Sequence, residues 1–377
     1  MQAIEDKLRL ALSRRTADGT LRTLNIMSGI DFSSNDYLGL ARADLDHNAA
    51  SGGSTGSRLI TGNHSKLSEL EAYIAAFHGF ENSLLFSSGY AANTGLLACL
   101  GTADDVIISD GLIHASLIDG IRLSSAKRAR FAHNDLAELE AKLIQYSGQI
   151  SGQIYVVVEA LYSMDGDTAP LIKMAALCEQ YGAALIVDEA HSGGIYGPQG
   201  RGLVAQLGLQ DKVFAVIYTF GKAVGLHGAV ICGSDTLKDY LINFCRTFIY
   251  TTAPSLSVAA ATQKAYKRLE SADSARADLE NIIKYFQNKT RLTHSPYAIW
   301  LESSSPIQAL IIPDNRRAKA LATSLQTQGF AIKAILSPTV PKGQERLRIS
   351  LHSFNTRAQI DALMTAIELQ LHKELAA

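Results

Sequence analysis

The chain contains few cysteines, prolines and tryptophans. It contains 4 cysteines, 8 prolines and 1 tryptophan among 377 residues. The four cysteines, Cys99, Cys178, Cys232 and Cys245, stand far apart, so their spacing matches neither a metal-binding motif nor a set of disulfides. We expect them to be buried apolar side chains in a protein of a reducing compartment.

An excess of charge of one sign is also missing. Lysine and arginine number 35 and aspartate and glutamate 36, without long blocks of either sign. This balance argues against a nucleic-acid or anionic-membrane partner. The N-terminus lacks the apolar core of a signal peptide, and no uncharged apolar stretch of about 18 residues follows. We therefore expect a cytoplasmic globular protein that acts on small molecules.

A phosphate loop of the form G-x-x-x-x-G-K-[ST] does not occur in the sequence. The letters DEAH at residues 188–191 therefore do not indicate a helicase. They follow an apolar strand and precede a Gly-rich segment, and this placement needs a different explanation.

Apolar strands alternate with helical patterns through most of the chain. Helices are predicted at 66–77, 135–146 and 171–181, and strands at 83–86, 106–109, 128–131, 154–159, 184–188, 213–219 and 228–232. This alternation predicts an α/β fold with a doubly wound, mostly parallel sheet. A helical region at 256–286 leads to strands at 309–312, 331–335 and 347–351 and helices at 317–328 and 357–371, which predict a small α+β domain. We expect an N-terminal docking helix and arm (1–45), a large domain (46–275) and a small C-terminal domain (276–377).

Two of these strand ends carry reactive side chains. Lys222 follows the strand at 213–219, whereas Asp188 and His191 follow the strand at 184–188. Open α/β sheets bind ligands at this edge. A buried lysine forms a Schiff base with an aldehyde, and an aspartate keeps a pyridinium nitrogen protonated. The pair indicates a pyridoxal 5'-phosphate (PLP) site, although Asp188 alone also suits a helix N-cap and His191 a loop histidine.

Further strand ends offer side chains and amides to such a site. Gly89 and Tyr90 open a helix after the strand at 83–86, where main-chain amides favour an anion such as phosphate. His114 follows the strand at 106–109 and is placed to stack on a pyridine ring, while Ser163 follows the strand at 154–159. Capping and ordinary turn roles are alternatives for each of them.

An arginine of the small domain is a candidate for binding a carboxylate. Arg348 projects from the alternating strand RLRIS, and its planar guanidinium matches the carboxylate of an amino acid. Arg346 is two residues away and is expected on the same face of the strand, so the alternation does not show which arginine binds the carboxylate.

The chain resembles the α-oxoamine synthases, which are PLP enzymes of the fold-type I aminotransferase superfamily. The resemblance covers nearly the whole length and is carried by FSSNDYLGL, SGGSTGSRLITGNHSKLSELE, LLFSSGYAAN, HASLIDG, YSMDGD, VDEAH, GRG, TFGKAVGLHGA and PTVPKGQERLRIS, in the family's order. It implies a fold-type I transferase with a large sheet domain and a small α+β domain. The run Ser192-Gly193-Gly194 and the short segment between Arg22 and Asp31 depart from many relatives.

The resemblance also implies roles for individual residues. Lys222 would carry PLP, Asp188 would pair with its ring nitrogen and His114 would stack on its face. The ring hydroxyl would contact Ser163 and His191. The phosphate would be bound by Gly89, Tyr90 and Thr219, with Thr251 or Thr252 from the second subunit of a homodimer with shared active sites. The substrate would contact Arg22, Asn35, His114, Thr339 and Arg348.

The reaction implied is the decarboxylative condensation of L-alanine with a pimeloyl thioester of coenzyme A or acyl carrier protein. It yields 8-amino-7-oxononanoate, an intermediate of biotin synthesis. Sister reactions remain alternatives: glycine with acetyl-CoA or succinyl-CoA, and serine with a long-chain acyl-CoA. A PLP transaminase or lyase and a catalytically silent subunit are alternatives of other classes, and the silent subunit predicts a lost lysine.

Overall fold

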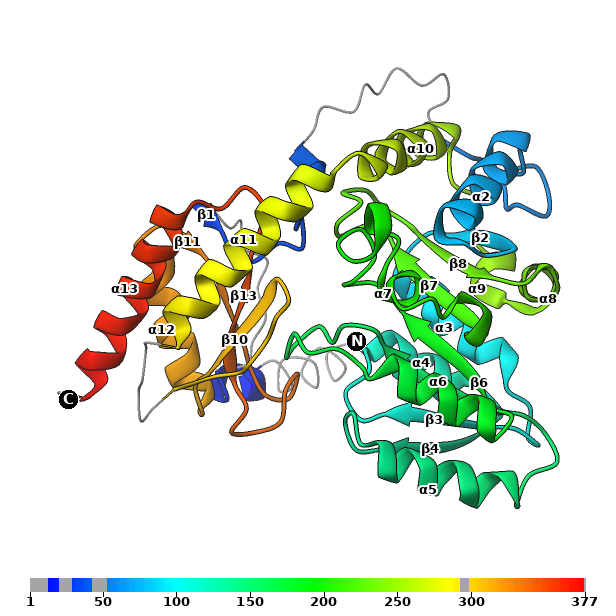
Figure 1. The fold of residues 1–377 in the computed structure, drawn as a ribbon, viewed down its shortest axis with the longest axis horizontal. Coiled ribbons are helices and arrows are strands. Elements are labelled where there is room, and N and C mark those ends of the chain that lie inside the picture. The colour runs from blue at the N-terminus through cyan, green and yellow to red at the C-terminus, as the bar shows by residue number, and fades with distance from the viewer. Residues whose placement is uncertain (1–12, 20–28, 43–52, 292–297, 376–377) are drawn as a thin grey trace, which may run out of the picture. The chain divides into compact units, whose positions relative to one another are not determined.

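The computed structural model describes residues 13–19, 29–42, 53–291 and 298–375 (Figure 1). Its contacts divide the chain into a larger unit, Asp36–Ser163 with Thr168–Arg276, and a smaller unit, Met1–Asn35 with Met164–Asp167 and Ala277–Ala377. The docking helix expected at residues 1–16 lies mostly outside the described residues. The three sequence-derived domains stay a prediction.

A seven-stranded sheet forms the centre of the larger unit (Figure 1). Its strand order is β2-β8-β7-β6-β5-β3-β4, and within this sheet only β8 runs antiparallel to its neighbours. The expected doubly wound, mostly parallel sheet is therefore confirmed. The strands are β2 (Asn82–Phe86), β3 (Val106–Asp110), β4 (Lys127–Phe131), β5 (Ile154–Glu159), β6 (Ala184–Asp188), β7 (Ala215–Thr219) and β8 (Ala229–Gly233).

Helices connect these strands. Several of them are preceded by an N-cap residue whose side chain accepts a hydrogen bond from a backbone amide of the first turn. Ser88, Asp135, Ser234 and Ser255 each accept a hydrogen bond from an amide of the following first turn. The helical region expected at 256–286 is two helices, because the chain leaves helical geometry at Ser271 and Ala272. The helices are α2 (Ser65–His78), α3 (Gly89–Leu100), α4 (Ala115–Leu123), α5 (Leu136–Ser147), α6 (Leu171–Gln180), α7 (Leu203–Gln206), α8 (Asp235–Phe244), α9 (Arg246–Ile249) and α10 (Leu256–Glu270).

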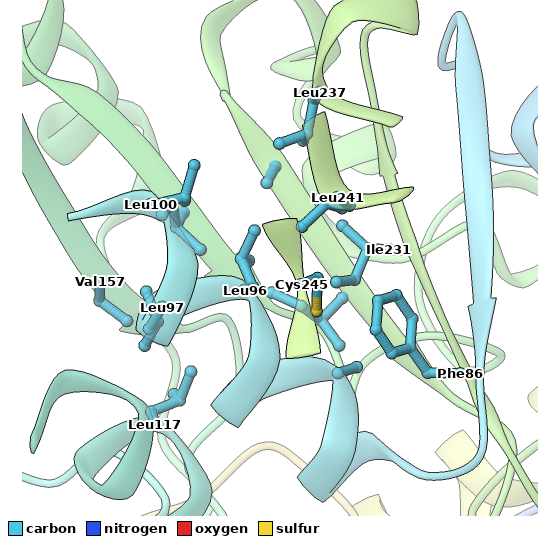
Figure 2. Close-up of a cluster of buried hydrophobic side chains, with 14 of the residues drawn as sticks. Phe86, Leu96, Leu97, Leu100, Leu117, Val157, Ile231, Leu237, Leu241 and Cys245 are labelled. Carbon is cyan, nitrogen blue, oxygen red and sulfur yellow. The ribbon is translucent and has the colours of Figure 1, made fainter. Parts of the chain in front are cut away.

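A buried apolar cluster fixes α3 against the sheet (Figure 2). Leu96 and Leu97 of α3 lie in one cluster with Phe86, Ile231 and Leu241, and all five are nearly inaccessible to solvent. Burying an apolar side chain of this size contributes about 1.5–3 kcal/mol. The cluster therefore holds α3, whose first turn lies at the carboxyl edge of the sheet, in a fixed position.

The smaller unit contains a four-stranded antiparallel sheet in the order β12-β13-β10-β9. The strand expected at 331–335 is divided, because β11 (Phe330–Ala331) pairs with β1 (Ile30–Asp31) whereas β12 (Lys333–Ile335) pairs with β13 (Arg346–Ser350). The remaining elements are β9 (Ile299–Trp300), β10 (Ile307–Ile311), α11 (Asp273–Thr290), α12 (Asn315–Thr327) and α13 (Arg357–Leu375). No described helix combines the length and apolarity needed to cross a bilayer.

Candidate active site

Five parallel strands of the larger unit bring the predicted site residues to one edge of the sheet. Strands β2, β3, β5, β6 and β7 run in the same direction, so their carboxyl ends share this edge. Each is followed or ended by a predicted site residue, in chain order Gly89, His114, Ser163, Asp188 and Thr219. The edge is the place where open α/β sheets bind ligands.

Asp188 is a buried carboxylate at the last position of β6. It is 4% exposed, its Oδ1 accepts the amide of Ala190 at 2.8 Å, and its Oδ2 accepts the side-chain amide of Asn93 at 2.7 Å. A buried charge needs such donors. Asp188 is not a helix N-cap, because the chain continues from it into turns rather than into a helix.

Lys222 lies in the turn that follows β7 and is partly buried. Its Nζ lies 3.4 Å from Oγ1 of Thr219, the last residue of that strand. The charge of Lys222 lowers the pKa of His114, and the charge of Asp188 raises it, while partial burial of the imidazole makes the largest contribution and lowers the pKa below its usual value. Lys222, Asp188 and His114 therefore lie close enough to interact electrostatically, and their joint catalytic role stays a prediction.

His191 is held by a residue that sequence reasoning missed. The hydroxyl of Tyr37 lies 2.8 Å from Nδ1 of His191, and both side chains are buried, Tyr37 completely. Tyr37 belongs to the FSSNDYLGL segment, where only its aromatic ring could have indicated that the side chain is buried. Ser163 is partly buried in the turn that follows β5, and its contact with the ring hydroxyl stays a prediction.

The first turn of α3 lies beside Thr219, and together they are the predicted phosphate site. Ser88 caps the helix by accepting the amide of Ala91 at 3.1 Å, and the helical geometry leaves the amides of Gly89 and Tyr90 without an intrahelical acceptor. A Cβ at position 89 would lie 2.3 Å from Cγ2 of Thr219. Glycine is therefore required for this close approach, and the helix dipole favours an anion here.

Glu159 is a second buried acid of the site, and sequence reasoning missed it. It ends β5 in register with Asp188 and is 2% exposed. Burial raises its pKa well above the usual value, and the neighbouring Asp188 adds to the increase. Burial thus favours the protonated form of Glu159. The backbone amides of His114 and Ser163 also interact with Glu159.

Thr251 and Thr252 lie in the loop after α9. Thr252 lines a pocket of about 160 Å³ with Phe86, Ser87 and Phe220, and Thr251 lines a smaller pocket beside it. Their expected contribution to the site of a second subunit stays a prediction.

Of the residues expected to contact the substrate, Asn35, Thr339 and Arg348 belong to the smaller unit and His114 to the larger one. Arg348 on β13 donates to Oδ1 of Asn35 and to Oγ of Ser350, each at 3.0 Å. Arg346 instead forms an ion pair with Asp165 and donates to the carbonyl of Gln344 at 2.9 Å. The guanidinium of Arg346 is thus already committed to a carboxylate. Thr339 is exposed in a turn, and Arg22 lies outside the described residues.

The groups of the larger unit fit the chemistry of PLP. The cofactor requires an amine for its aldehyde, a carboxylate for its ring nitrogen and a site for its phosphate. Lys222 and Asp188 would supply the first two, and the N-terminus of α3 with Thr219 would supply the third. Four fully or largely buried cysteines remain free thiols outside this donor set.

Comparison with known proteins agrees with this chemistry. Residues 28–367 match the family of class I and II aminotransferases. The 8-amino-7-oxononanoate synthase of Marinobacter nauticus is 42% identical over 360 residues, which cover 93% of this chain and 88% of that protein.

Solved structures show the same likeness. The 8-amino-7-oxononanoate synthase of Francisella tularensis is 31% identical with a TM-score of 0.77, covering 92% of this chain and 99% of that one. A serine palmitoyltransferase from S. paucimobilis with bound PLP and myriocin is 26% identical with a TM-score of 0.89, covering 100% and 99%. The chain belongs to the class I and II aminotransferase family of PLP-dependent enzymes, in the group that contains the 8-amino-7-oxononanoate synthases.

Proposed function

We propose that this protein is a PLP-dependent acyltransferase that condenses L-alanine with a pimeloyl thioester and forms 8-amino-7-oxononanoate for biotin synthesis. The observation that carries the proposal is the 42% identity to an 8-amino-7-oxononanoate synthase over 93% of the chain. The reactive groups agree with it, because Lys222, Asp188 and His114 interact electrostatically at one edge of the sheet.

When bound, PLP withdraws electrons from the α-carbon of an attached amino acid and thereby acidifies its α-proton. Lys222 supplies the amine that holds the cofactor, and its Nζ then accepts the α-proton of alanine. Asp188, held by Asn93 and Ala190, would keep the ring nitrogen protonated. His114 would cover the ring face, and Tyr37 holds the imidazole of His191, which would contact the ring hydroxyl.

The acyl step joins the α-carbon of alanine to the thioester carbonyl carbon. The thiolate of coenzyme A or of acyl carrier protein leaves, the carboxylate of alanine departs as CO2, and a proton takes its place at the α-carbon. Arg348 binds the alanine carboxylate before it is lost. Arg348 is preferred to Arg346 for this role because Arg346 is paired with Asp165.

A sister condensation is the second candidate. The serine palmitoyltransferase from S. paucimobilis has the higher TM-score of the two solved neighbours, 0.89 against 0.77, but the lower identity, 26% against 31%. The overall fold is shared by both enzymes, and the 42% identity to the synthase of Marinobacter nauticus supports alanine and a pimeloyl group. A silent subunit is disfavoured, because Lys222 is present beside Thr219.

The active unit proposed is a homodimer. Several large apolar side chains on the loops beside the Thr251 and Thr252 pockets are exposed, among them Ile60 at 79% and Tyr250 at 73%. A second copy that covers these loops would bury apolar surface and bring both threonines near a neighbouring phosphate seat. A cytoplasmic location, as expected from the sequence, belongs to the same proposal.

Thiol release measured with purified protein tests the reaction. Alanine, glycine and serine are each combined with acetyl, succinyl, pimeloyl and palmitoyl thioesters, and carrier choice is tested by comparing coenzyme A with acyl carrier protein. Alanine with the pimeloyl thioester is expected to give the fastest release together with CO2. Faster release by serine with the palmitoyl thioester would support the second candidate. Amino transfer to a keto acid without thiol release would contradict both.

A further inference from the structure

One buried amide connects two of the residues proposed to contact the cofactor. The side chain of Asn93, on the first turns of α3, is 2% exposed. Its Nδ2 donates to Oδ2 of Asp188 at 2.7 Å and to Oγ of Ser116 at 3.0 Å. Because a carboxylate oxygen is only an acceptor, the amide group that faces Asp188 must be the NH2. Both hydrogens of Asn93 are therefore used inside the site.

The same chain of hydrogen bonds continues to His114. Oγ of Ser116 lies 2.7 Å from Nδ1 of His114, and the backbone amide of Ser116 donates to the same nitrogen at 3.2 Å. A backbone N–H is only a donor, so Nδ1 of His114 must be an acceptor. The Ser116 hydroxyl accepts from Asn93 and donates to Nδ1, which gives the chain a single direction. The ring proton of His114 consequently resides on Nε2.

We propose that Asn93 and Ser116 are positioning residues that align Asp188 with the ring nitrogen of the cofactor and hold His114 as the neutral Nε2–H tautomer. The inference rests on the proposed PLP chemistry, but it does not depend on which amino acid or thioester is used. Asn93 and Ser116 touch Asp188 and His114 and act on the cofactor through them.

The proposal explains why position 93 is an asparagine. An aspartate would bring a second carboxylate against Asp188, and a leucine would leave Oδ2 of Asp188 without its side-chain donor. Oδ1 of Asn93 is buried and accepts no hydrogen bond from any residue that the structure describes. A buried acceptor left without a donor costs stability, so the two donated bonds are a reason to retain the amide.

The tautomer is tested in the full-length protein after removal of the cofactor, which separates this test from any assay of activity. Nitrogen NMR of labelled histidine is expected to show a protonated Nε2 and an unprotonated Nδ1 for His114 at neutral pH. In Ser116→Ala the Nδ1 signal should shift, because the hydroxyl donor is lost. Thr94→Val is the matched control, since Thr94 bonds only to the carbonyl of Ser116 among its described contacts, at 3.1 Å. A proton on Nδ1 in the unaltered protein would overturn the proposal.

The alignment of Asp188 is tested by the dissociation constant of PLP, measured by fluorescence at several pH values. Asn93→Leu should weaken binding about 10- to 100-fold, as expected for a lost hydrogen bond to a charged group, and Thr94→Val should change it less than about twofold. Asn93→Asp should bind more weakly than Asn93→Leu at neutral pH and recover as the pH falls, because a protonated carboxyl can donate to Asp188. Equal binding by Asn93→Leu and the control, or no recovery in Asn93→Asp, would overturn the proposal.

Discussion

The hydroxyl of Tyr37 lies 2.8 Å from Nδ1 of His191, although 154 residues separate the two in the chain. The contact fixes the ring of a histidine proposed to bind the ring hydroxyl of PLP. Tyr37→Phe keeps the buried ring but removes this hydrogen bond, which is worth about 1 kcal/mol.

We therefore expect Tyr37→Phe to weaken PLP binding about fivefold, measured by equilibrium dialysis. The control is Tyr218→Phe, since the buried hydroxyl of Tyr218 has no hydrogen-bond partner among the described residues. That variant should bind PLP like the unaltered protein. Equal effects of the two substitutions would contradict a role for the Tyr37 contact.

The phosphate seat is tested at Gly89. In Gly89→Ala the new Cβ would meet Cγ2 of Thr219 at 2.3 Å, which pushes the helix start away from the strand end. PLP binding should fall at least tenfold, because the amides and the hydroxyl of Thr219 no longer converge. Spectrophotometric titration with PLP measures the effect.

Two further variants make the Gly89 test specific. Gly89→Ala combined with Thr219→Ser removes the clashing methyl group and keeps the hydroxyl, so much of the binding should return. Gly148→Ala is a neutral control, since a Cβ there has nothing within 4 Å. If the double variant binds no better than Gly89→Ala alone, the clash is not the cause.

His78 makes stability depend on pH. Burial lowers its pKa to about 3, and its ring lies between the carbonyl of Arg201 at 3.0 Å and the hydroxyl of Tyr266 at 3.2 Å. The unfolded chain binds a proton at His78 below about pH 6.5 and the folded protein does not, so stability is lost as the pH falls from about 6.5 towards 3.

At pH 5 this effect amounts to about 2 kcal/mol relative to pH 7.5. Urea unfolding at both pH values measures the loss. In His78→Gln, which cannot be protonated, the loss between the two pH values should be smaller by that amount. An unchanged difference would show that His78 is charged or accessible in the folded protein.

Arg346 and Arg348 should respond differently to substitution. Arg346→Ala leaves the partly exposed carboxylate of Asp165 without its partner and should lower the free energy of unfolding by roughly 1–3 kcal/mol. Arg348→Lys should leave stability nearly unchanged but raise KM for alanine about tenfold, because an ammonium lacks the planar pair of donors. Steady-state kinetics and urea unfolding of both variants check this. The reverse pattern would assign the carboxylate to Arg346.

Much of the site was predictable because parallel strands present their carboxyl ends at one edge. The periodicity of apolar residues located β5, β6 and β7, and the polar residues that follow them identified Ser163, Asp188 and Lys222. The sequence did not reveal partners supplied by other segments. Asn93 reaches Asp188 across 95 positions, and such contacts leave no local pattern.

Glu159 was missed for a different reason. A carboxylate at the end of an apolar strand is expected to be solvated, and only the register with Asp188 shows that it is buried with a raised pKa. The division of the strand expected at 331–335 likewise depends on two different partner strands, β1 and β13.

The central claim is that Lys222 carries the cofactor. The most direct measurement is mass spectrometry of peptides after borohydride treatment of the protein with PLP bound. We expect a reduced pyridoxyl phosphate adduct on Lys222. In Lys222→Ala both this adduct and the visible absorption band of the imine should be absent. An adduct on another lysine, or an unmodified Lys222 in protein that still turns over, would contradict it.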